Sequence, residues 1–241
     1  MVSYEFDMPS TLQGFYNAAF GQFFAALGVQ AATYFTYTPL DVAEYNPGWI
    51  VHYFNLRHTP SKGAAFLAGR HIFDSVKPDT SIPEDNDIWE GDGWYISRSK
   101  DAVYYIDDKQ LVAYGNCDVP SVIRDRMTAS GSIPVVNRSG NGIWTMERIE
   151  EGWLLTVLPS QKYVADPLRG RLYNAKFGTM ANRYVNCNRE HAVSRLQEKP
   201  DWFKFDIGKI LSVTDNRGNE IKEQDGKYSL YAGIYKIIMK S

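Results

Sequence analysis

The hydrophobic pattern of the chain changes near residues 78–90, and this change restricts the possible folds more than any other feature. Before it, apolar residues recur at spacings of three and four over residues 11–28, which is typical of a helix. After it, short apolar runs alternate with turn residues such as Arg217-Gly218-Asn219 and Asp225-Gly226, which is typical of antiparallel strands. The sequence therefore predicts an α/β part followed by an all-β part.

The first part, residues 1–77, alternates strands and helices. A short strand over residues 2–6 precedes the helix at 11–28, in which Gly28 is a natural end, and a buried strand is expected over 29–37. A second helix begins at Pro60, with Thr59 as its cap. Such alternation predicts parallel strands, and two strands alone cannot form a parallel sheet that is buried on both faces.

The second part is expected to be a separate unit. Residues 78–90 are rich in Pro, Asp and Ser and are interpreted as a linker. Residues 91–241 then form an antiparallel β-sandwich, which is long enough to bury a core of its own.

Composition and charge exclude several classes of function. The net charge is −2 and no basic run is present, so no nucleic-acid partner is predicted. No apolar stretch is long enough to span a membrane. No signal peptide is visible, and secretion stays open if the native start lies upstream. Cys117 and Cys187 are far apart, and the spacing of His52, His58 and His71 matches no metal motif, so no cofactor or metal is expected.

Aromatic residues reach 14%, with 16 Tyr and 6 Trp. Tyr and Trp combine a large apolar surface with a polar tip, which suits ligand clefts and interfaces. The cores of β-sandwiches use the same residues, and core packing is the commoner explanation.

Several stretches carry a resemblance to a known family. The segments YEFD at 4–7, QAATYFTYTPLDVAEYN at 30–46 and HYFNLRHTPSKGAAFLAG at 52–69 resemble the last two strand–helix units of a (β/α)8 barrel of clan-A-like retaining glycoside hydrolases. Residues 94–115 are similar to the opening hairpin of the β-sandwich that commonly follows such a barrel. The resemblance covers most of residues 1–115 and implies a partial barrel followed by an accessory sandwich.

The resemblance also implies roles for individual residues. Glu5 ends the strand that carries the nucleophile, and barrel active sites lie at the carboxyl ends of strands. The aromatic residues after the next strand would form a wall of the sugar site, and nearby carboxylates would bind hydroxyls, although Asp7 also suits a turn or a helix cap. The candidate substrate-binding residues are Asp7, Tyr34, Tyr37, Asp41 and Glu44. The polar residues Asn55, Arg57, His58 and Lys62 are expected to pin the last helix.

The chain departs from the family in one large respect. A retaining glycosidase needs a second carboxyl group about 5–5.5 Å from the first, and the family places it on the fourth strand, which has no counterpart here. The sequence therefore predicts the C-terminal portion of a glycoside hydrolase acting on carbohydrate, inactive without the remaining strands. Its partner would be the rest of the barrel or a second copy of the chain. The alternative is a non-catalytic β-sandwich module that binds carbohydrate or braces a partner chain, so enzymatic activity stays open.

Overall fold

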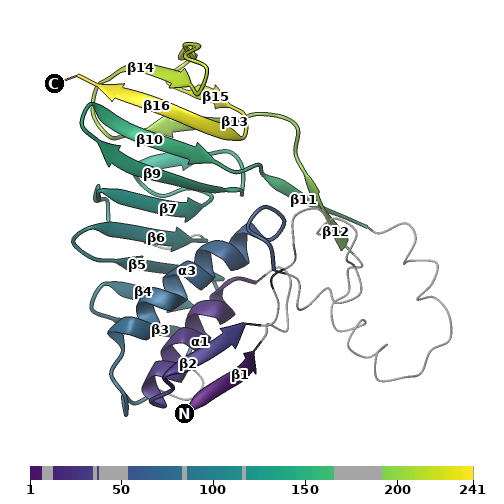
Figure 1. The fold of residues 1–241 in the computed structure, drawn as a ribbon, viewed down its shortest axis with the longest axis vertical. Helices are drawn as coiled ribbons and strands as arrows, with labels where there is room; N and C mark the ends of the chain where they lie inside the picture. The colour runs from purple at the N-terminus through teal and green to yellow at the C-terminus, as the bar shows by residue number, and fades with distance from the viewer. Residues whose placement is uncertain are drawn as a thin grey trace.

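The computed structural model describes residues 1–6, 13–34, 37, 54–82, 86–115, 118–165 and 192–240. This part of the chain is mostly β-sheet, with two helices packed against one another (Figure 1). The elements form layers, from a pair of parallel strands through the two helices to a large sheet and a small sheet that covers its other face.

The large sheet has nine strands among the described residues, in the order β14-β16-β10-β9-β7-β6-β5-β4-β3. Neighbouring strands are antiparallel except β6 and β7, which run parallel from Gln110↔Arg126 to Tyr114↔Ser130. The expectation of a wholly antiparallel sheet is therefore wrong at this pair, because β7 begins beside the first residue of β6. The strands are β3 (Ile88–Gly91), β4 (Trp94–Ser97), β5 (Ala102–Ile106), β6 (Gln110–Tyr114), β7 (Arg126–Ser130), β9 (Ile143–Ile149), β10 (Gly152–Val157), β14 (Ile210–Asp215) and β16 (Gly233–Met239).

Strand β3 begins at Ile88, so the last residues of the segment expected as a linker already belong to the sheet. Ile88 pairs with Ser97 of β4, and Gly91 pairs with Trp94. Trp94 is buried in the apolar cluster beneath the helices. The start of the large sheet thus lies directly against the α/β part.

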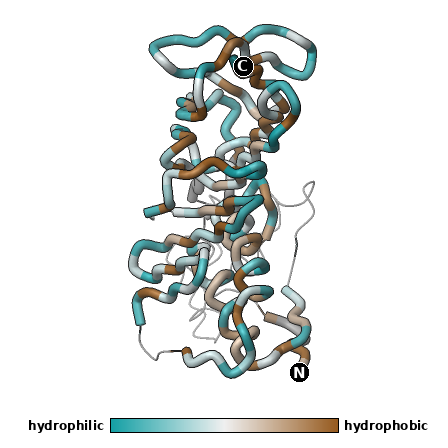
Figure 2. The backbone as a smooth tube through the Cα atoms, turned by 90° about the vertical axis from the view of Figure 1, so that its left-hand side faces the viewer, coloured by the Kyte–Doolittle hydropathy of each residue, from teal (hydrophilic) through white to brown (hydrophobic). Residues whose placement is uncertain are grey.

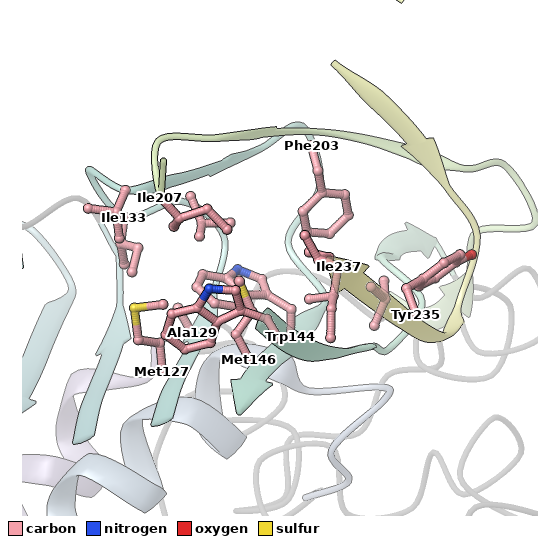
Figure 3. Close-up of a cluster of buried hydrophobic side chains, with 14 of the residues drawn as sticks. Met127, Ala129, Ile133, Trp144, Met146, Phe203, Ile207, Tyr235 and Ile237 are labelled. Atoms are coloured by element: carbon pink, nitrogen blue, oxygen red, sulfur yellow. The ribbon is translucent and has the colours of Figure 1, made fainter. Parts of the chain in front are cut away.

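A three-stranded sheet covers one face of the large sheet and forms the sandwich with it. Its strands are β8 (Val136–Arg138), β13 (Asp201–Phe205) and β15 (Tyr228–Leu230), in the order β15-β13-β8. Side chains alternate along each strand, so Trp144 and Met146 of β9 point together into this core, where Phe203 meets them from the small sheet (Figure 3). Trp144, Met146 and Phe203 are fully buried.

The two helices cover part of the opposite face of the large sheet. They are α1 (Phe15–Ala26) and α3 (Pro60–Ser75). In β6 the alternation is direct, because Val112 belongs to the helix-side cluster whereas Leu111 and Ala113 belong to the sandwich core. Strand β6 is therefore covered on both faces.

Small residues bring the helices close together. A Cβ atom on Gly21 of α1 would lie 2.2 Å from the carbonyl oxygen of Gly69 in α3, so the contact requires glycine. Helix α1 ends as expected, since Gly28 has φ of +66° and its N–H donates to the Ala25 carbonyl at 2.9 Å. Pro60 begins α3, but the Thr59 hydroxyl bonds the backbone of Asn55 instead of capping the helix.

A pair of parallel strands lies on the far side of the helices (Figure 1). These are β1 (Val2–Phe6) and β2 (Ala31–Tyr34), paired from Val2↔Ala31 to Phe6↔Tyr34. The Phe6 ring contacts Phe20 and Phe24 of α1, so the β1-α1-β2 segment forms one compact unit. The strand predicted as buried over 29–37 is shorter, and its residues alternate between exposed and half-buried because only one face meets the helices.

A carboxylate joins α1 to the large sheet. Oδ1 of Asp101 accepts hydrogen bonds from the backbone N–H groups of Gly14 (2.9 Å) and Phe15 (3.1 Å), which begin the helix. Its Oδ2 accepts one from the Tyr114 hydroxyl at 2.5 Å. A Cβ atom on Gly14 would lie 2.6 Å from the Tyr114 ring, so glycine is required there as well.

A buried ion pair joins two strands of the small sheet, β8 and β13, and its hydrogen bonds reach residues at the ends of β9 and β10 in the large sheet. The guanidinium of Arg138 donates from Nη2 and Nε to Oδ2 of Asp201, at 2.7 and 3.0 Å, and from Nη1 to the Gly142 carbonyl at 2.7 Å. The Ser160 hydroxyl donates to the same Asp201 oxygen at 2.6 Å. Because these buried groups satisfy one another, the cluster is structural.

Beyond β10 the chain extends away from the sandwich as an antiparallel pair, β11 (Gln161–Ala165) and β12 (Ala192–Leu196). The loops at the end of the molecule that carries the C-terminus are mostly hydrophilic (Figure 2). In β14 and β16, Val213 and Ile237 are fully buried, whereas Leu211 and Ile234 are exposed.

Candidate functional site

The carboxyl ends of β1 and β2 are the place where the sequence predicts catalysis. Glu5 lies in β1, one residue before Phe6, which pairs with Tyr34 at the end of β2. The carboxyl ends of β1 and β2 therefore lie next to each other. The Glu5 side chain lies outside the described part of the structure, as do Asp7, Asp41 and Glu44.

Tyr34 packs between the strand pair and α3. Its ring lies 5.2 Å from Phe6, 5.1 Å from Phe54 and 5.6 Å from Phe66, measured between ring centroids. Its hydroxyl is buried and has no hydrogen-bond partner within the described residues, and burial raises its pKa. Tyr34 thus belongs to an aromatic layer that packs the strand pair against α3.

Tyr37 lies just beyond the end of β2. It forms an isolated parallel bridge with Phe54, and the two rings meet edge to face at 5.7 Å. Its side chain is 52% exposed. Tyr37 is therefore partly exposed just beyond the end of β2, and it also borders the groove described below; its role in a sugar wall stays a prediction.

The turn before α3 is built from the polar residues expected to pin that helix. Oδ1 of Asn55 accepts hydrogen bonds from the backbone N–H groups of Arg57 (2.9 Å) and His58 (3.3 Å). The Thr59 hydroxyl donates to the Asn55 carbonyl at 3.0 Å. Asn55, His58 and Thr59 are all buried, so the turn is fixed by its own side chains.

Lys62 is the most unusual titratable residue of this region. It is fully buried in the first turns of α3, and desolvation lowers its pKa to about 7. The sequence carries a signal that could have identified it, because Lys62 shares a face of α3 with the buried residues Ala65, Gly69 and Ile72 at helical spacing.

A groove of about 490 Å³ lies between α3 and the uncovered part of the large sheet. Its floor includes a row of three threonines, because Thr145 of β9 pairs with Thr128 of β7 on one side and with Thr156 of β10 on the other. The hydroxyls of Thr128 and Thr145 are 3.0 Å apart. This row could be found only from the strand register, since the three residues are separated in sequence.

One end of the groove is polar. The His71 ring stacks on Tyr105 with centroids 4.9 Å apart, and its Nδ1 lies 3.4 Å from Nε2 of Gln110. The same Gln110 amide donates to Oδ2 of Asp107 at 3.2 Å. Both N–H bonds of Gln110 are thus in use, so Nδ1 of His71 is an acceptor and the ring proton of neutral His71 lies on Nε2. Burial lowers the pKa of His71.

The described residues hold no cluster of three His, Cys, Asp or Glu side chains placed to bind a metal ion. None of the helices in the described ranges is long and apolar enough to cross a membrane.

Comparisons with known proteins give no relatives: no family model, no curated protein and no solved structure matches the chain. The interpretation of the site therefore depends on the geometry and on the sequence resemblance.

Proposed function

We propose that this chain is the C-terminal portion of a retaining glycoside hydrolase that acts on carbohydrate. In this proposal, β1, α1, β2 and α3 are the last strand–helix units of a (β/α)8 barrel, Glu5 is the nucleophile, and the sandwich is an accessory domain. The observation that supports it most is the parallel β1-α1-β2 unit, in which Glu5 lies at the carboxyl end of β1. Catalytic residues of barrel enzymes occupy this position.

The pairing of β1 and β2 adds support. Among the described strands, β1 pairs with β2 alone, and just beyond β2 Tyr37 forms a parallel bridge with Phe54, so the β1 edge has no partner within the described residues. Exposed edges of this kind recruit further strands. Additional parallel strands would complete the sheet and bring the acid/base carboxylate that hydrolysis needs.

A covalent label tests the role of Glu5. Dinitrophenyl 2-deoxy-2-fluoro-glycosides of gluco, galacto, manno and xylo configuration would be incubated with the chain assembled with the polypeptide that supplies the missing strands. A carboxylate oxygen attacks C1 and dinitrophenolate leaves without protonation, so labelling does not depend on the acid/base residue. We expect one of these sugars to be found on Glu5 by peptide mass mapping.

Two variants make this test decisive. Glu5→Gln should remove the label, whereas Glu150→Gln, in the exposed turn between β9 and β10, should leave it unchanged. Labelling that persists in Glu5→Gln, or an assembled enzyme that takes up none of the sugars, would show that Glu5 is not the nucleophile.

The β1 edge, which has no partner within the described residues, also favours a second candidate function, a non-catalytic module that docks on a partner chain. The two candidates differ in whether the assembled complex hydrolyses glycosides. Size-exclusion chromatography with light scattering gives the mass of the assembly, and hydrolysis of aryl glycosides by that assembly decides between them. A stable complex without hydrolysis would favour the docking module.

A further inference from the structure

The lining of the groove between α3 and the large sheet includes no residue of β1 or β2, and the proposed function does not use most of it. Its volume of about 490 Å³ lies within the range of about 300–1,000 Å³ that is common for small-ligand pockets. Its lining comes from α3, the turn before it, and strands β6, β7, β9 and β10. Rigid elements on both sides therefore hold its shape.

One end of the groove is apolar. Leu56, Ile143 and Leu158 meet there beside the first turn of α3. Gly63 lets these side chains pack closely against α3, because a Cβ atom at this position would lie 2.8 Å from Cδ1 of Ile143 and 2.9 Å from Cδ2 of Leu56. The rings of Tyr37 and Phe54 extend this end. A flat or branched apolar group would be desolvated here.

The opposite end carries mainly hydrogen-bond donors. Arg70 of α3 borders it, and its guanidinium has no carboxylate partner within the described residues. Arg126 of β7 donates from one nitrogen to Glu147 at 2.8 Å and keeps further N–H groups. His71 adds its Nε2–H. The acids nearby are Glu147, bonded to Arg126, and Asp107, bonded to Gln110 and Tyr105, while Asp74 also acts on His71.

We infer that this groove binds a small organic carboxylate with an apolar body about the size of one ring. The apolar end takes the body, the threonine row lines the middle, and Arg70 and Arg126 bind the carboxylate. Guanidinium groups pair with carboxylates through two parallel N–H bonds, and the donor-rich end matches an acceptor-rich head group. This site is independent of the proposed hydrolase activity.

Calorimetric titration with 4-phenylbutyrate tests the inference, with 4-phenylbutyramide as the matched neutral ligand. We expect the carboxylate to bind at least about tenfold more tightly than the amide, because charge-assisted hydrogen bonds contribute more than neutral ones. Arg70→Gln should weaken binding of the carboxylate about five- to tenfold and leave the amide unchanged. Arg98→Gln, an exposed arginine outside the groove, is the control and should change neither.

A second variant covers the apolar end. Leu67→Trp fills the groove from α3 and should abolish binding of both ligands, with the fold checked by circular dichroism. Equal affinity for acid and amide, unchanged affinity in Arg70→Gln, or unchanged affinity in Leu67→Trp would each overturn the inference. Failure of both ligands to bind the wild-type chain would also overturn it. Glu5→Gln should not alter the titration, so this result and the test of catalysis are read separately.

Discussion

The contact between Asp101 and the start of α1 gives the most direct test of how the helices are held on the sheet. Replacing Asp101 removes the acceptor of three hydrogen bonds, from the backbones of Gly14 and Phe15 and from the Tyr114 hydroxyl. Asp101 is half-buried, so water can reach part of the site, and the usual value of about 1 kcal/mol for each bond applies instead of the larger one for buried charged groups. The expected loss is about 3 kcal/mol of unfolding free energy.

The backbone of Asp101 adds a second contribution that can be separated from the first. Its φ is +45°, which asparagine and glycine adopt readily but alanine does not. Asp101→Gly should therefore cost about 3 kcal/mol from the hydrogen bonds alone, and Asp101→Ala about 4 kcal/mol with the added strain. Asp101→Asn keeps an acceptor oxygen and should cost about 1 kcal/mol.

Urea unfolding followed by tryptophan fluorescence and circular dichroism measures these differences, provided that the m-values agree. Asp225 is a matched control, because it has φ of +52° and is exposed at a turn. Its glycine variant should be neutral and its alanine variant should lose about 1 kcal/mol. If Asp101→Gly lies within about 0.5 kcal/mol of wild type, the carboxylate does not hold the helix and the reasoning is refuted.

Three further predictions concern titration and the buried ion pair. Burial raises the pKa of Asp101, so the stability that this group contributes is complete below its unfolded-state pKa and falls as pH rises through its folded-state pKa. In urea titrations, the stability advantage of wild type over Asp101→Asn should therefore shrink from about pH 4 upward. Burial lowers the pKa of Lys62 to about 7, so the unfolded state binds more protons than the folded state between pH 7 and 10.5. The free energy of unfolding of wild type relative to Lys62→Met should therefore rise by up to about 1.4 kcal/mol per pH unit in this range. A difference between the two proteins that does not change with pH would contradict this. Arg138→Met should cost about 3–5 kcal/mol because it leaves Asp201 buried without its cation, whereas Arg138→Met combined with Asp201→Leu should recover much of that loss in thermal unfolding.

The sequence predicts the elements well where a single residue controls the backbone. Pro60 begins α3 and Gly28 follows the end of α1, because proline and glycine restrict or permit particular dihedral angles. The direction of β7 was not predictable in this way. Its parallel pairing with β6 depends on the end of β6 beside which β7 begins, and alternation of apolar residues is the same for either direction.

The site was predictable only in part. Glu5 and Tyr34 were placed at strand ends by resemblance, and the structure puts the ends of β1 and β2 side by side, although the Glu5 side chain lies outside the described residues. The groove could not be found from the sequence. Its floor depends on the register that aligns Thr128, Thr145 and Thr156, and register is a property of strand pairing that no local pattern encodes.

Strand β6 has a consequence for how the molecule comes apart. The same five residues supply a wall to the helices through Val112 and to the sandwich through Leu111 and Ala113. Because both cores share β6, unfolding of one core would expose one face of the strand that supports the other, so the two cores are expected to unfold in a single cooperative step. A protease cut between residues 77 and 88 would accordingly leave two fragments that stay together until both lose their structure.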